Sequence, residues 1–77
     1  MPTVLEINIE GAEFRVLKRY LNSSHARSVN SLIIQFHNFV EDSELQRAEI
    51  RKLLTKDYDE VFCYPFVWEQ WDLKSTL

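Results

Sequence analysis

Residues 4–17, which read VLEINIEGAEFRVL, decide the fold. Leu5, Ile7 and Ile9 alternate with polar residues, which is typical of a strand with one buried face. After Gly11 the apolar residues recur at helical spacing instead, so the chain changes from strand to helix within a few residues. Gly11 stands at this corner, where a residue without Cβ tolerates a sharp turn. We therefore predict the opening of a βαβ unit, whose strand-to-helix turn usually carries function.

The remaining sequence predicts a second helix and three further strands. Ser43 and Gln46 match a capping box, which marks the start of the second helix. The apolar side of this helix is expected to hold Leu45, Ile50, Leu53 and Leu54. The predicted elements after the first strand are a helix over residues 12–22, a strand over 31–39, a helix over 43–56 and strands over 58–64 and 66–73.

The order of these elements predicts an α/β fold with two layers. Both strand–helix–strand connections are expected to be right-handed. If both also advance in the same direction across the sheet, the two helices lie on one face. We expect a four-stranded mixed sheet in the order 1-2-4-3, with the last strand antiparallel. Strand parity places six apolar side chains under the helices: Leu5, Ile7, Ile9, Leu32, Ile34 and Phe36. The opposite face is bare and more polar, and carries Val4, Glu6, Asn8, Ile33, Gln35 and His37.

Composition limits the classes of function. A chain of 77 residues is one domain, over residues 1–77. A net charge of −3 without a basic cluster argues against a nucleic-acid partner. No apolar run approaches the roughly 20 residues that span a bilayer, and no leader precedes the first strand, so we expect neither a membrane partner nor secretion. The single cysteine, Cys63, fits a reducing compartment, which we take as the cytoplasm, and is expected to be a small buried hydrophobe.

Three stretches together resemble one known family. Residues 7–13 (INIEGAE), followed by Val16 and Leu17, resemble the strand-four motif of the FkbM-type S-adenosylmethionine-dependent methyltransferases, which typically reads KIDVEGAE with VL a few residues on. Residues 33–37 (IIQFH) are similar to the family's next strand, and residues 64–71 (YPFVWEQW) resemble its C-terminal hairpin. The resemblance implies that residues 1–77 form the C-terminal half of a seven-stranded, Rossmann-like methyltransferase domain.

The same resemblance implies that the cofactor half of the domain is missing. The family binds its cofactor mainly through its first half, with a Gly-rich loop after strand one and an acidic residue that ends strand two. This chain has one glycine, Gly11, and it lies in the later motif. S-adenosylmethionine is therefore expected in a full-length relative, and no residue here is assigned to it. Asn8 and Gln35 replace the family's usual Asp and Glu, which puts in doubt any role that needs a carboxylate there.

The predicted site lies at the carboxyl ends of the first two strands, where open α/β sheets bind ligands. In the functional interpretation, Glu10 or His37 is the general base that deprotonates an acceptor oxygen, while Asn8, Gly11 and Glu13 bind the substrate. In the structural interpretation, Glu10 and Glu13 favour the helix dipole by roughly 0.3–1 kcal/mol, and His37 is a sheet-face histidine with a backbone partner. No spacing of ligands here resembles a zinc set, so no metal residue is assigned.

Two functions remain open at this point. The first is the acceptor side of an FkbM-like O-methyltransferase, inactive alone and partnered by a missing N-terminal half. The second is a small non-catalytic module that self-associates or docks a partner through its bare sheet face or free first strand. Residues 62–71 hold five of the ten aromatic residues, which fits either core packing or an interface. Four charged residues of the second helix are expected to be solvated: Arg47, Glu49, Arg51 and Lys52.

Overall fold

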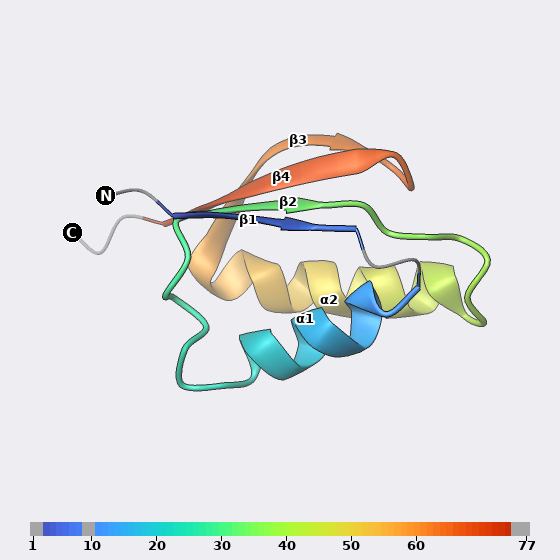
Figure 1. Ribbon diagram of the computed structural model, residues 1–77, viewed down its shortest axis with the longest axis horizontal. Coiled ribbons are helices and arrows are strands. Elements are labelled where there is room, and N and C mark those ends of the chain that lie inside the picture. Colours follow the sequence, from blue (N-terminus) through green and yellow to red (C-terminus); the bar gives the residue numbers. More distant parts are fainter. Residues whose placement is uncertain (1–2, 9–10, 75–77) are drawn as a thin grey trace.

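A computed structural model describes residues 3–8 and 11–74 of the chain. Its elements are β1 (Val4–Ile7), α1 (Glu13–Leu21), β2 (Ser31–Ile34), α2 (Ser43–Asp57), β3 (Tyr58–Tyr64) and β4 (Trp68–Leu73). The strands form one layer, and both helices lie on the same side of it (Figure 1). The two-layer α/β architecture predicted from the sequence is therefore confirmed.

The four strands pair in the order β1-β2-β4-β3. β1 runs parallel to β2, and β4 is antiparallel to both of its neighbours, β2 and β3. In this register Leu5 lies opposite Leu32, and Leu32 lies opposite Trp71. The predicted order, with the last strand antiparallel, is confirmed. Because residues opposite one another share a face, the inner residues of β4 are those in phase with Trp71.

The core lies between the sheet and the two helices. Phe14 and Leu17 of α1 are buried in it, and the ring of Phe14 stacks on that of Phe36 with centroids 5.3 Å apart. Ile50 and Leu54 of α2 pack into the same cluster. Trp71 is buried on the inner face of β4, so its role in packing is confirmed.

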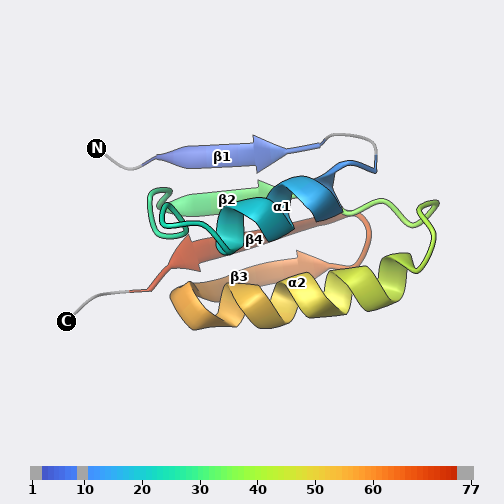
Figure 2. The same ribbon diagram turned by 90° about the horizontal axis from the view of Figure 1, so that it is seen from below.

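The helix layer does not extend under β1. In the view from the helix side, α1 lies over β2 and β4, α2 lies over β3, and β1 falls outside the covered strip (Figure 2). Val4, Leu5 and Glu6 are all exposed, and only Ile7 of this strand is buried. The prediction that Leu5 packs beneath a helix is therefore wrong, because the helix that follows β1 crosses over its neighbour instead.

Two strands are shorter than predicted. β2 ends at Ile34 rather than at residue 39, and Phe39 is exposed. The amide of Gln35 still donates to the carbonyl of Ile7, which is the last residue of β1, and β4 on the other side of β2 begins at Trp68. β4 begins at Trp68 rather than at residue 66, since Phe66 adopts a left-handed conformation with a φ of 59° in the turn.

The capping box predicted for α2 is wrong. The helix starts after Asp42, which has a φ of 55°, and no side chain caps it. The Ser43 hydroxyl instead donates to the carbonyl of Asn38 at 3.3 Å, and the Gln46 amide donates to the carbonyl of Glu41 at 2.7 Å. Both side chains therefore fasten the preceding loop. Leu45, in the first turn, is exposed rather than part of the apolar side of the helix.

Candidate functional site

The strand-to-helix corner is closed around Gly11. This residue has a φ of +104°, and its amide donates to Glu13 Oε1 at 2.8 Å. A Cβ at this position would lie 2.9 Å from Val40 Cγ2 and 3.2 Å from Phe39 Cε2. The loop between β2 and α2 therefore approaches the corner so closely that glycine is required for both conformation and space.

We expect Gly11→Ala to lower the free energy of unfolding by about 1–3 kcal/mol, because alanine is strained at this φ and crowds Val40. Urea denaturation monitored by circular dichroism measures the loss. The matched control is Ala12→Gly at the neighbouring position, where φ is an ordinary −86°. There we expect a loss below about 1 kcal/mol. Equal losses for the two variants would show that the corner does not require glycine.

Glu13 is the centre of the corner. It opens α1 and is fully buried, with an exposed fraction of 0%. While Oε1 accepts the Gly11 amide, Oε2 accepts the backbone amide of His37 at 2.7 Å and lies 3.1 Å from His37 Nδ1. One carboxylate thus joins the turn after β1 to the segment after β2. These donors compensate the cost of burying the charge.

The contact with Glu13 orients the His37 imidazole. Both carboxylate oxygens already accept backbone N–H groups, so we assign the ring proton to Nδ1. In the neutral imidazole with this tautomer, Nε2 is the nitrogen that can accept a proton. The side chain is 15% exposed, and the exposed ring of Phe39 meets it edge-on with centroids 5.5 Å apart. The arrangement is a carboxylate–imidazole pair near the surface, of the kind that supports general-base chemistry.

Of the residues predicted for the site, the structure brings together Gly11, Glu13 and His37. Asn8 follows β1 and is exposed. Glu10 lies outside the described residues. Strand parity predicted His37 on the bare face, and this is wrong: β2 ends at Ile34, and the ring is free to turn towards α1.

Comparison of the chain with family models, with curated proteins and with solved structures gave no match. The site must therefore be judged from its own geometry. Within residues 3–8 and 11–74, no group of three or more histidine, cysteine or acidic side chains is placed to hold a metal ion. In the same part of the chain, no helix has both the length and the apolar character needed to cross a bilayer.

Two surface hollows lie near the helices, and neither includes the Glu13–His37 pair in its lining. One, of about 450 Å³, is formed by Val40 and the first turn of α2. Another, of about 480 Å³, lies between α1 and α2, and Lys18, Lys52 and Lys56 contribute to its lining. Neither of these two hollows encloses the pair.

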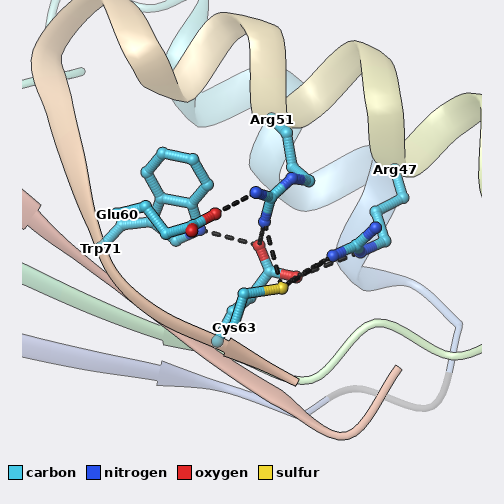
Figure 3. A network of polar contacts seen from close by, with 6 residues as sticks. Arg47, Arg51, Glu60, Cys63 and Trp71 are labelled. Carbon is cyan, nitrogen blue, oxygen red and sulfur yellow. Dashed lines mark hydrogen bonds and ion pairs between the residues drawn. The ribbon is translucent and has the colours of Figure 1, made fainter. Parts of the chain in front are cut away.

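A second polar cluster joins α2 to the β3–β4 hairpin (Figure 3). Its centre is the carboxylate of Glu69, which is 1% exposed on the inner face of β4. Arg47 donates to Oε2 at 3.1 Å, Arg51 to Oε1 at 2.6 Å and Trp71 Nε1 to Oε1 at 2.8 Å. Arg51 also pairs with Glu60. The prediction that both arginines are solvated is wrong.

Cys63 belongs to this cluster and is not the buried hydrophobe that was predicted. Its Sγ lies 3.0 Å from the Arg47 guanidinium and 3.7 Å from Glu69 Oε2. Burial and the negative charge of Glu69 raise the pKa of the Cys63 thiol, and these effects exceed the opposing influence of the arginines. A raised pKa disfavours the thiolate, so the cluster does not present an activated nucleophile. We interpret it as a structural ion-pair network.

Proposed function

We propose that this chain supplies the acceptor side of an FkbM-like, S-adenosylmethionine-dependent O-methyltransferase and is inactive alone. The observation that carries the proposal is the Glu13–His37 pair, at the carboxyl ends of the parallel strands β1 and β2. The strand–turn–helix corner of the EGAE segment and the observed order of the sheet also support it. The lone cysteine, Cys63, favours a reducing compartment such as the cytoplasm for this function.

In this proposal His37 is the general base. Nε2 accepts the proton of an acceptor hydroxyl, which leaves the oxygen able to attack. Glu13 is fully buried, so it acts as a positioning residue: it holds the ring in the Nδ1–H tautomer and faces the imidazolium that forms. Glu10 and Asn8, from the sequence prediction, remain candidates for contact with the acceptor.

The described residues do not fit the cofactor. A Gly-rich turn binds phosphate or ribose through free backbone amides and open space at its glycines. At Gly11 the amide is already bonded to Glu13, and Val40 and Phe39 fill the space beside Cα. We therefore assign no residue to S-adenosylmethionine, and another part of the enzyme has to bind it.

The tautomer of His37 tests this proposal directly. We expect ¹⁵N NMR of the imidazole at neutral or slightly alkaline pH to show a protonated Nδ1 and an unprotonated Nε2. The opposite tautomer would exclude His37 as a base that acts through Nε2. The second measurement is calorimetric titration with S-adenosylmethionine, where we expect no heat of binding. Tight binding of the cofactor by this chain alone would contradict the proposal that another part of the enzyme binds it.

A non-catalytic interaction module is the second candidate function. The specific observation in its favour is exposed apolar surface on uncovered parts of the sheet. Phe62 and Tyr64 lie side by side on the face away from the helices, with ring centroids 5.8 Å apart, and Val4 is exposed on the uncovered strand β1. Such surface is typical of protein contacts. Size-exclusion chromatography with light scattering tests this candidate, and a chain that stays monomeric at high micromolar concentration would contradict self-association.

A further inference from the structure

The ring of Phe39 is an exposed aromatic surface beside the His37 imidazole. Phe39 is 69% exposed, although phenylalanine is among the residues that are most often buried. Its ring meets the imidazole with centroids 5.5 Å apart, and its Cε2 and Cζ atoms lie against Gly11. The strand-to-helix corner therefore holds the ring next to the proposed base and leaves much of its surface open.

The apolar surface continues beyond Phe39. Val40 also lies against Gly11, and it lines the hollow of about 450 Å³ at the start of α2. Leu45, in the same lining, is 61% exposed. Apolar side chains thus extend from the proposed base to this hollow. Because aromatic rings gain from stacking on one another, the surface suits a ligand with a flat aromatic part.

The corner offers little stabilisation to an anion that forms beside His37. Backbone amides are common donors to a developing oxyanion. Here the amides of Gly11 and His37 both donate to Glu13, so neither is available to the ligand. The Glu13 carboxylate next to the imidazole is itself negative. The site therefore favours an acceptor whose own structure stabilises the oxygen anion.

Phenols have this property. A phenol ionises near pKa 10, as the tyrosine side chain does, whereas the O–H group of water has a pKa of about 15.7. The aromatic ring spreads the charge of the phenolate, so the anion depends less on donors from the protein. The same ring supplies the flat aromatic part that fits Phe39. The exposed ring and the occupied amides thus select the same class of acceptor.

We propose that the acceptor is a phenol whose ring stacks on Phe39 while its hydroxyl donates to His37 Nε2. In the proton transfer the O–H bond breaks, its electron pair stays on the phenolate oxygen, and the proton moves to Nε2. The resulting imidazolium faces the Glu13 carboxylate. Phe39 is then the residue that selects the acceptor. The proposal rests on the methyltransferase function proposed above and specifies the acceptor for it.

Three small probes test the acceptor class on the isolated chain by NMR. They are phenol, benzyl alcohol, which keeps the aromatic ring but has an aliphatic hydroxyl, and cyclohexanol, which has neither an aromatic ring nor an acidic hydroxyl. We expect phenol to shift both the Phe39 ring signals and the His37 Nε2 signal, with a dissociation constant of about 1–30 mM. Benzyl alcohol should shift Phe39 with a smaller change at Nε2. Cyclohexanol should bind about three- to tenfold more weakly than phenol.

Phe39→Leu tests the stacking contact. The side chain is largely exposed, so the variant should fold, and circular dichroism checks this. We expect its affinity for phenol to fall about three- to tenfold, while the tautomer of the free imidazole stays unchanged. The matched control is Phe62→Leu, the same substitution at an exposed ring on the face away from the helices. This control should bind phenol at Phe39 as the wild type does.

Four results would overturn the proposal. They are no shift at His37 with phenol at about 100 mM, a shift at Nε2 that is as large with cyclohexanol or benzyl alcohol as with phenol, phenol shifts confined to Phe62 and Tyr64, and an unchanged affinity in Phe39→Leu. The probe series on the wild type decides alone if Phe39→Leu does not fold. The tautomer of the free imidazole and the cofactor titration are measured without these probes, so failure of the phenol proposal is distinguishable from failure of the methyltransferase proposal.

Discussion

Replacement of Glu69 by alanine is expected to lower the free energy of unfolding by about 3–5 kcal/mol, because it leaves two partly buried guanidinium groups without the buried carboxylate that they share. A chain of 77 residues has about 4–12 kcal/mol of stability in total. The variant should therefore be largely unfolded or have a strongly lowered melting temperature. Urea denaturation followed by tryptophan fluorescence and circular dichroism measures the loss.

The size of this effect comes from how the Glu69 carboxylate is shared. Arg47 and Arg51 have side chains that are 16% and 26% exposed, and both reach the carboxylate, which is 1% exposed. Arg51 also stacks over the Trp71 ring, 4.9 Å from its centre, while the indole N–H donates to the same carboxylate. In Glu69→Ala, two guanidinium groups and an indole N–H lose their common acceptor, and unpaired buried donors are costly.

Glu60→Gln is the control for this prediction. Glu60 also pairs with Arg51, but its side chain is 40% exposed. Exposed ion pairs contribute little, so we expect a loss below about 1 kcal/mol. If Glu69→Ala costs no more than Glu60→Gln, then solvent rather than Glu69 compensates the arginines. Combining Glu69→Met with Arg47→Met and Arg51→Leu should recover much of the stability, because an apolar replacement of the whole network removes the unpaired charges as well.

Sequence periodicity predicted the strands and helices, and the order of these elements with the rule for right-handed crossovers predicted the sheet. It also contained a signal for the Glu69 network that the sequence interpretation missed. Glu69 is two residues from Trp71, so strand parity places it on the inner face, and Arg47 and Arg51 are four apart on one side of a helix. A buried carboxylate opposite two such arginines was therefore readable once Trp71 was placed in the core.

The ends of elements were harder to predict, since they depend on what lies beside them. The apolar run of residues 31–39 continues past Ile34, yet β2 ends at Ile34, close to the point where its antiparallel neighbour β4 begins, at Trp68. The capping box failed for a similar reason: Ser43 and Gln46 bond to loop carbonyls that no local pattern specifies. In both cases tertiary contacts, rather than the local sequence, determine the conformation of the backbone.

The sequence predicted where the candidate site lies but not which of its residues are hydrogen-bonded to one another. The turn glycine, the acidic helix start and a histidine near the carboxyl end of the next predicted strand were all assigned to one corner, and Gly11, Glu13 and His37 do meet there. The sequence did not predict that the Glu13 carboxylate is hydrogen-bonded to both Gly11 and His37. That depends on the path of the segment after β2, which brings the His37 amide to within 2.7 Å of the carboxylate.

Glu13→Ala is expected to lower the free energy of unfolding by about 2–4 kcal/mol, since it leaves the amides of Gly11 and His37 without an acceptor in a buried corner. Glu13→Gln should also be costly, by about 1–3 kcal/mol. Its carbonyl replaces only one carboxylate oxygen, and its NH₂ group then faces an N–H donor. In both variants the His37 ring should lose its preference for the Nδ1–H tautomer, which ¹⁵N NMR reports independently of stability.

His37→Ala separates the two parts of this interaction. It removes the imidazole but keeps the backbone amide that donates to Glu13 Oε2 at 2.7 Å. The ring is near the surface, so we expect a loss of only about 0.5–1.5 kcal/mol, the value of one hydrogen bond. Equal losses for His37→Ala and Glu13→Ala would mean that the ring, rather than the two backbone amides, holds the corner together. A smaller loss for His37→Ala would instead show that Glu13 holds the corner together mainly through the two backbone amides, so the fold and the proposed chemistry depend on the same carboxylate.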